Sequence, residues 1–174
     1  KQIDLDNLRT NIGMVLQDSK ILQGTIRENI AYGKPNASIE EIKQAAELSF
    51  ANTFIEKLPD GYDTYISNSD MLSEGEVQLL NIARIMLIKP PILILDEATS
   101  NIDLLTEDMI KKAILELTSN STSIIIAHRL STIKNCDFIV FIEDGNIVEV
   151  GTHDELINKK GAYYNMYKSQ FNLI

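Results

Sequence analysis

Two adjacent carboxylates, Asp96 and Glu97, end the apolar run "ILILDE" and are the residues of this sequence best suited to chemistry. One carboxylate can hold the water shell of Mg²⁺, and its neighbour can accept a proton from an attacking water. Ligands of open α/β sheets bind at the carboxyl ends of buried strands, where this pair is expected to lie. A strand that ends in a solvated acidic turn gives the same pattern, so the pair alone does not decide between the two.

Two further polar residues follow apolar runs in the same way. His128 comes directly after "SIIIA", where an imidazole can contact a phosphate oxygen. Gln17 ends "IGMVLQ", where its carbonyl oxygen can ligate Mg²⁺ or orient a water. The structural alternatives are a histidine bonded to a backbone carbonyl and a glutamine that merely leaves a strand. His128 follows its predicted strand in the same way as Asp96 ends its own, which favours a functional role for His128. For Gln17, the residue type alone favours the structural alternative. His153 is expected on the surface.

The stretch "LSEGE", residues 72–76, combines an anion-site pattern with negative charge. Ser73 and Gly75 at the start of a helix suit a phosphate, and Ser73 with Glu76 forms a capping box. Glu74 has no such role. A carboxylate about 5–6 Å from a phosphate costs roughly 3 kcal/mol per unit charge at an effective dielectric near 20. The helix dipole returns only about 0.3–1 kcal/mol, so this helix start is expected to cap well and bind phosphate poorly.

The elements that position these residues can be inferred from hydrophobic periodicity. Continuous apolar runs predict strands buried on both faces of a parallel sheet, and amphipathic stretches predict helices between them. Capping boxes at Ser38/Glu41 and Thr152/Glu155 mark two further helix starts. The predicted strands are 12–17, 92–96 and 123–128. The predicted helices are 25–33, 38–58, 74–88, 106–120, one from 152 and 162–171, and 137–151 is a hairpin turned at Asp144 and Gly145.

This alternation predicts an α/β fold with a parallel-sheet core and a helical insertion. We expect residues 1–23 and 89–174 to form the α/β core and residues 24–88 to form the helical subdomain.

The composition narrows the function classes. The chain has 174 residues, a net charge of -9 and a pI near 4.7, which argues against a nucleic-acid surface and against adhesion to anionic lipid. A single cysteine, Cys136, excludes an internal disulfide and a thiolate metal cluster. No apolar run has the length of a membrane span, and no signal peptide is recognised. The opening "KQIDLDNLRTN" reads as mid-domain sequence, so we expect a fragment.

The motifs together are far more specific than each one alone. A glutamine at a strand end, a Ser-x-Gly helix start, a strand that ends in Asp-Glu, "SNID" and "AHRLST" occur in this order. The whole chain resembles the ATPase domain of an ABC transporter of the exporter type. Six segments carry the resemblance: "LRTNIGMVLQD", "GTIRENIAYG", "LPDGYDT", "ILILDEATS", "IIAHRLSTI" and "GTHDELI".

The resemblance implies a P-loop NTPase-like (RecA-like) core with ATP and Mg²⁺ as ligands. It matches Gln17 to the Q-loop glutamine that contacts Mg²⁺ and Asp96 to the Walker B aspartate. It also matches Glu97 to the catalytic base and His128 to the switch histidine near the γ-phosphate.

The resemblance further implies composite sites between two domains. Ser73 and Gly75 match the signature loop, which contacts nucleotide held by a partner domain, and Asp103 in "SNID" matches the D-loop aspartate. The implied partners are a transmembrane domain of the same transporter and a second nucleotide-binding domain, identical or not, with no nucleic acid. The implied location is the cytoplasmic face of a membrane.

The sequence departs from the family pattern in three places. Its 174 residues contain no G-x-x-x-x-G-K-[ST], because Gly33-Lys34 is flanked by Glu28 and Pro35 where glycine and Ser or Thr belong. We therefore expect the chain alone to be inactive and the intact protein to hydrolyse ATP. In the signature, acidic residues replace a glycine and a glutamine, and apolar residues replace basic ones. The segment "SNSDM" resembles the family's coupling segment poorly.

These departures leave two alternatives to a hydrolysing exporter domain. One is a non-catalytic regulatory or dimerisation module of an asymmetric transporter, which the acidic signature favours. The other is a DNA-repair-type ABC ATPase, which the short insertion and the acidic charge disfavour.

Overall fold

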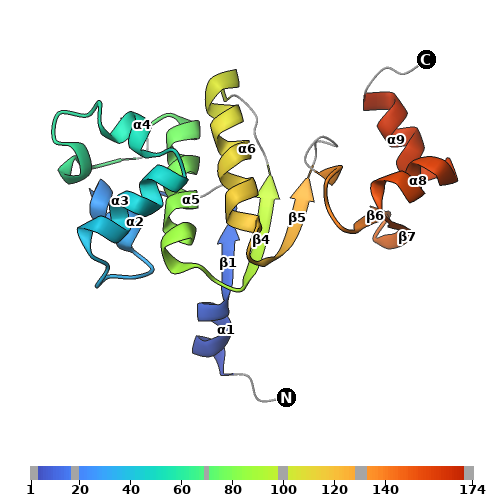
Figure 1. Ribbon diagram of the computed structural model, residues 1–174, viewed down its shortest axis with the longest axis horizontal. Coiled ribbons are helices and arrows are strands. Elements are labelled where there is room, and N and C mark those ends of the chain that lie inside the picture. The colour runs from blue at the N-terminus through green and yellow to red at the C-terminus, as the bar shows by residue number, and fades with distance from the viewer. Residues whose placement is uncertain (1–3, 17–19, 69–70, 98–101, 128–132, 171–174) are drawn as a thin grey trace. The chain divides into compact units, whose positions relative to one another are not determined.

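The computed structural model describes residues 4–16, 20–68, 71–97, 102–127 and 133–170 (Figure 1). Its contacts divide the chain into two compact units, residues 1–126 and 127–174. The division predicted at residues 24 and 88 is a different one and stays a prediction.

The first unit contains a three-stranded sheet in the order β1-β4-β5, with β1 at Ile12–Val15, β4 at Ile92–Glu97 and β5 at Thr122–Ala127. β1 and β4 pair in parallel, with Val15 opposite Leu95. The arrows of all three strands point the same way in Figure 1. The predicted parallel core is therefore confirmed, although β1 ends earlier than predicted.

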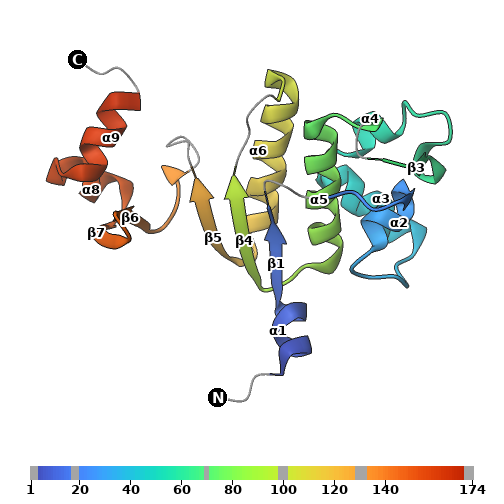
Figure 2. The ribbon, with the colours of Figure 1, turned by 180° about the vertical axis from the view of Figure 1, so that it is seen from behind.

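Two long helices, α5 (Glu74–Ile88) and α6 (Leu104–Thr118), belong to the same unit. In Figure 2 the strands lie in front of α6, and α5 lies beside β1. Leu93 and Leu95 are buried, whereas Ile124 and Ile126 are 57% and 50% exposed. The prediction of strands buried on both faces was wrong for β5. Successive side chains of a strand point to opposite faces, and one set of them here faces solvent.

A smaller helical layer precedes α5. The predicted helix over 38–58 is divided at Phe50, which adopts a left-handed φ of 63°. The elements of this layer are β2 (Gly24–Thr25), α2 (Ile26–Ala31), α3 (Ile39–Leu48), α4 (Asn52–Ile55), the 3-10 turn η1 (Gly61–Asp63) and β3 (Tyr65–Ile66). A further helix, α1 (Leu5–Asn11), lies ahead of β1 and was not predicted.

Four helices begin with a capping box, in which the first residue and a glutamate three positions later exchange hydrogen bonds. The predicted boxes at Ser38, Ser73 and Thr152 are confirmed, and Thr25 begins α2 in the same way. The starts of these helices are thus set by local sequence.

The second unit contains the predicted hairpin and two helices. β6 (Ile139–Glu143) and β7 (Asn146–Gly151) pair antiparallel through a turn in which Asp144 and Gly145 have positive φ. Helices α8 (His153–Lys159) and α9 (Ala162–Gln170) follow. Tyr163 is fully buried in the centre of this unit.

His153 is not the surface residue that we predicted. It is half-buried, and its Nδ1 lies 2.8 Å from the hydroxyl of Tyr163. Its ring also contacts Tyr167, with centroids 5.2 Å apart. This contact could not be predicted, because both tyrosines belong to α9, which follows a turn whose angle is set by packing.

Helices that could cross a membrane are not found among the described residues.

Candidate functional site

The carboxyl ends of the sheet strands lie at one edge of the sheet. β1 ends at Val15, opposite Leu95, and Asp96 and Glu97 complete the neighbouring strand β4. β5 lies on the other side of β4 and ends at Ala127. Asp96 is half-buried. The edge predicted to hold the chemistry is therefore formed by three adjacent strands.

The structure does not describe the side chains of three predicted site residues. Gln17 and His128 lie outside the described residues, as does the side chain of Glu97. Their described neighbours Leu16 and Ala127 lie at the carboxyl ends of β1 and β5. In the sequence, Gln17 comes directly after Leu16 and His128 directly after Ala127, and the roles of Gln17, Glu97 and His128 stay predictions.

The donor set at this edge fits a magnesium ion held mainly by phosphate and water. Within the described ranges there is no group of three or more His, Cys, Asp or Glu side chains that could hold a metal. Mg²⁺ in phosphoryl-transfer sites commonly uses one or two carboxylates together with substrate phosphates and waters. A single half-buried carboxylate, Asp96, is sufficient protein ligand for such an ion.

The start of α5 places Ser73 in direct contact with Glu76. The Ser73 amide donates to Glu76 Oε2 at 2.8 Å, and the Ser73 hydroxyl donates to the same oxygen at 2.9 Å. The Glu76 amide in turn donates to Ser73 Oγ at 3.3 Å. A carboxylate of the chain itself therefore takes both donors that Ser73 could offer to a phosphate.

Glu74 occupies the first position of α5 and is exposed, whereas Gly75 beside it is buried. An anion that approaches this helix start meets the Glu74 carboxylate in addition to Glu76. The capping part of the expectation is confirmed, and that this helix start disfavours phosphate stays a prediction.

Asp103 caps α6. Its Oδ1 accepts hydrogen bonds from the amides of Leu105 and Thr106 at 3.1 and 3.0 Å. Hydrogen bonding, first of all from the Thr106 side chain, lowers the pKa of the Asp103 carboxyl below its usual value. The sequence indicated a functional role for Asp103, and the structure adds this structural one.

Arg84 lies in the middle of α5 and was not identified from the sequence. Its Nε donates to the backbone oxygen of Asn29 at 2.6 Å, and a second nitrogen donates to Asn29 Oδ1 at 2.6 Å. A third nitrogen donates to the Lys20 oxygen at 3.1 Å and to Asn81 Oδ1 at 2.8 Å. These acceptors are neutral, and burial lowers the Arg84 pKa.

Asn29 is fully buried and extends this network. Its side-chain oxygen accepts from the Leu22 amide at 2.9 Å, and its nitrogen donates to the oxygens of Leu22 and Thr25. The segment that follows Gln17 is thereby joined to α2 and α5. The only signal in the sequence was that two polar residues, Asn29 and Arg84, are flanked by apolar residues in their helices.

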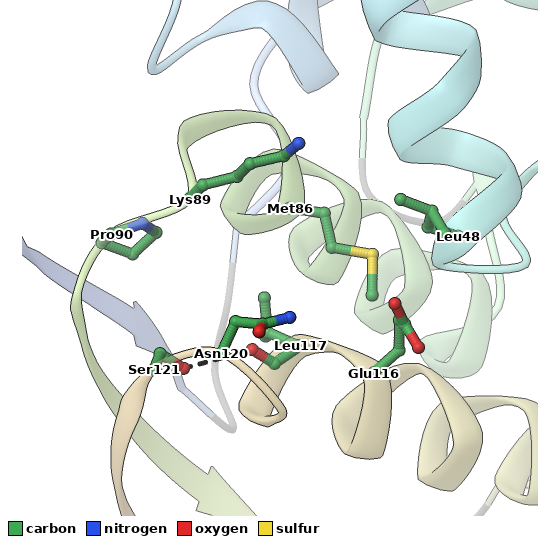
Figure 3. Close-up of a pocket in the computed structure, with 8 residues that line it drawn as sticks. All are labelled: Leu48, Met86, Lys89, Pro90, Glu116, Leu117, Asn120 and Ser121. Carbon is green, nitrogen blue, oxygen red and sulfur yellow. Dashed lines mark hydrogen bonds between the residues drawn. The ribbon is translucent and has the colours of Figure 1, made fainter.

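A cavity of about 190 Å³ lies at the opposite end of α5 (Figure 3). It is bordered by the ends of α3, α5 and α6, and in Figure 3 the Met86 side chain points between Leu48 and Glu116. Lys89, which ends α5, borders it as well, whereas Ser73 begins that helix. The predicted site residues are not among its lining residues, so this cavity is not part of the candidate site.

Comparison with known proteins gives consistent matches. Residues 1–100 match the protein family described as ABC transporter. An uncharacterized ABC transporter ATP-binding protein of Bacillus subtilis, YfiC, is 52% identical over 172 residues, which cover 98% of this chain and 28% of the relative. A putative multidrug export ATP-binding/permease protein of Staphylococcus aureus is 51% identical over 94% of this chain and 28% of its own length.

The fold comparison agrees. The solved structure of a bacterial Atm1-family ABC exporter with ATP bound matches with a TM-score of 0.85 and 42% identity, over 95% of this chain and 29% of that one. The chain thus spans less than a third of the length of the proteins that it matches.

Proposed function

Because the chain belongs to the ABC transporter family and has the exporter type of nucleotide-binding domain, we propose that it hydrolyses ATP within a membrane exporter and thereby drives transport. The ABC domain itself implies ATP binding. Magnesium dependence, turnover and the coupling to transport are the finer parts of this proposal.

The observation that carries the proposal is the shared edge of β1, β4 and β5. The family match includes the first two of these strands, and the resemblance assigns catalytic roles to residues that follow or end all three. Ligand binding at the carboxyl ends of parallel strands supports the same place.

The chain's own residues have the following proposed roles. Asp96 and Gln17 would hold Mg²⁺, which neutralises charge on the phosphates when it is bound. Glu97 would accept a proton from the attacking water, and His128 would donate a hydrogen bond to the γ-phosphate. Phosphoryl transfer depends mainly on positioning and charge stabilisation, which suits this set of residues.

The remaining predicted residues would serve a second domain. Ser73, Gly75 and Asp103 would contact nucleotide held by the partner nucleotide-binding domain, identical or not. A transmembrane domain of the same transporter would be the other partner, at the cytoplasmic face of the membrane. Relatives named as ATP-binding/permease proteins support this assembly.

The test is magnesium-dependent ATP hydrolysis by the full-length protein. Glu97→Gln should lower turnover about 100-fold or more while it preserves nucleotide binding, because an amide keeps the shape but cannot accept the proton. Glu143→Gln is the matched control, since Glu143 is an exposed glutamate that also ends a strand. Near-native turnover in Glu97→Gln would remove Glu97 as the base.

A second candidate function, a non-catalytic module in an asymmetric transporter, is favoured by the two acidic residues of the signature. Under that alternative, Glu97→Gln and the unmodified protein would have equally low turnover. The 174 residues expressed alone provide a further comparison, and we expect them to show no turnover, because they contain no phosphate-binding G-x-x-x-x-G-K-[ST].

A further inference from the structure

The first turns of α5 and α6 are in close contact at Gly75. A Cβ atom added to Gly75 would collide with Cγ2 of Thr106 and would lie 3.3 Å from Cγ2 of Ile102. Gly75 is buried, in accord with this contact. The absence of a side chain at Gly75 is therefore required by the neighbouring helix of the same chain.

Thr106 is not free to turn away from this contact. Its amide donates to Asp103 Oδ1 at 3.0 Å, and its side chain helps to lower the pKa of the Asp103 carboxyl. A rotation about χ1 that moved Cγ2 away from Gly75 would also change the position of the hydroxyl beside Asp103. One threonine thus meets a signature residue with its methyl group and the D-loop aspartate with its amide.

We propose that Thr106 is a positioning residue whose methyl group sets the spacing between the 72–76 loop and Asp103. The proposal rests on the proposed function, in which both motifs serve the partner domain's nucleotide. Two motifs that must reach one nucleotide together need a fixed distance between them, and the Gly75–Thr106 contact supplies it within a single chain. Preorganised geometry of this kind is a large part of phosphoryl-transfer catalysis.

This inference gives Gly75 a role different from the one that the resemblance implies. If glycine is needed only so that the backbone can approach a phosphate, changes at Thr106 have no effect on a Gly75 variant. If glycine is needed to admit the Thr106 methyl group, removal of that methyl group compensates for an added Cβ. The two roles therefore predict opposite results for one double variant.

The experiment compares Gly75→Ala with Gly75→Ala/Thr106→Ser in the full-length protein. Serine keeps the hydroxyl for Asp103 and lacks the colliding Cγ2. We expect Gly75→Ala to lower ATP turnover about 10-fold, as overpacking of a close contact does, and the double variant to regain most of it. Thr106→Ser alone should keep at least about half of the turnover, because its hydroxyl remains.

Two controls make the rescue specific. Thr106→Val keeps the methyl group and loses the hydroxyl, so Gly75→Ala/Thr106→Val should show no recovery. Gly33 is crowded in the same way by Ile88, and Thr106→Ser should not improve Gly33→Ala. Amide exchange of residues 103–110 provides a readout that does not require catalysis. Gly75→Ala should raise this exchange, and Thr106→Ser should reverse the rise.

Failure of this proposal can be told from failure of the proposed function. If Gly75→Ala/Thr106→Ser recovers neither turnover nor exchange protection, the spacing role of Thr106 is overturned. If Gly75→Ala/Thr106→Ser recovers exchange protection but the unmodified protein shows no ATP turnover, the proposed function is overturned while the steric contact stands. Thr106 would then have no role in catalysis. Recovery of protection without recovery of turnover in an active protein would also overturn the positioning role.

Discussion

At the scale of single residues, the Ser73 hydroxyl has two competing acceptors. One is the Glu76 carboxylate, which it meets at 2.9 Å, and the other is the phosphate of a partner's nucleotide in the proposed function. The amide of Ser73 is engaged by the same carboxylate. Because Glu76 also stabilises the helix start, its effect on a phosphate cannot be separated from its capping role, whereas the effect of Glu74 can.

The first prediction concerns Glu74. In a full-length complex, Glu74→Gly should raise ATP turnover at the site that this loop completes on its partner, by about 3- to 10-fold at low salt, because a repelling carboxylate is removed. The gain should shrink as ionic strength rises, since Glu74 is exposed. The measurement is steady-state hydrolysis with Glu97→Gln in the same chain, which silences the other site.

Controls for this prediction lie in the chain. Glu40→Gly also removes an exposed glutamate from the first turn of a helix, α3, and should leave turnover unchanged. Glu76→Gln should have a smaller effect than Glu74→Gly, because glutamine can also cap. Unchanged or lower turnover in Glu74→Gly would mean that Glu74 does not repel phosphate.

Sequence reasoning works well where the determinants are local to a residue. The pairing of Ser73 with Glu76 could be predicted because capping requires only two residue types three positions apart. The contact between Gly75 and Thr106 could not, because it depends on how two helices meet. Glycine is ambiguous in a sequence: the same residue allows a positive φ, a ligand approach or a helix contact.

At the scale of elements, two of the contacts of α5 bear on the predicted site residues. Its first turn contacts Thr106 of α6, and its middle is joined through Arg84 to α2 and to the segment 20–22. The start of the helix carries Ser73, and the segment 20–22 follows Gln17. Both groups of predicted site residues therefore depend on the placement of one helix.

The second prediction concerns Arg84. Arg84→Gln should lower the free energy of unfolding by about 2 kcal/mol, because the backbone and side-chain oxygens of the buried Asn29 lose the Arg84 donors. It should also speed amide exchange at Leu22, whose N–H bonds to Asn29 Oδ1. Urea denaturation of the full-length protein's ATP-binding domain and exchange mass spectrometry measure the two effects.

Arg27 offers the matched comparison. It is an exposed arginine of α2, paired with Asp63, and exposed pairs of this kind contribute about 0–1 kcal/mol. Arg27→Gln should therefore have little effect on stability and none on exchange at Leu22. Equal effects of the two substitutions would contradict the role assigned to Arg84.

Element boundaries were predictable where a cap or a proline marks them. Helix α5 agrees with the prediction at both ends, because Ser73 caps it and Pro90 and Pro91 follow it. The break at Phe50 was missed, since a bulky residue with positive φ is a poor candidate for a helix end. The exposure of β5 was missed because an apolar run does not reveal how many of its faces are covered.

At the scale of the whole molecule, acidic residues cap helices in both units. Thr25 and Ser38 share their helix starts with Glu28 and Glu41, and Asp103 caps α6 alone. The pKa of Glu28 is lowered first by the Thr25 amide, and that of Glu41 first by Lys34. The chain has 16 Lys and Arg against 25 Asp and Glu, so its cations are too few to pair with every carboxylate in place of these hydrogen bonds.

The third prediction follows from these lowered carboxyl pKa values. A depressed pKa in the folded state gives stability that is present above the pKa of the unfolded chain, about 4.3 for Glu, and is lost as pH falls through the folded value. The urea midpoint should therefore be nearly constant from about pH 7 to 5 and should fall below about pH 4.

Glu28→Gln should make this fall shallower, because one of the contributing carboxyls no longer titrates. Lys20→Gln changes an exposed cation outside these capping boxes and should leave the slope of the urea midpoint against pH unaltered. A midpoint that rises on acidification would contradict the linkage.

The pairing of β1 with β4 has a consequence for how the chain is made. Ile12 pairs with Ile92, so β1 leaves the ribosome long before its partner strand exists. The intervening helices begin with capping boxes that join residues only three positions apart, and these can form in the emerging chain. During that interval β1 lacks its partner β4, and a strand edge left without its partner can associate wrongly with other nascent chains. Its length of only four residues limits the number of hydrogen bonds that such a wrong partner could form.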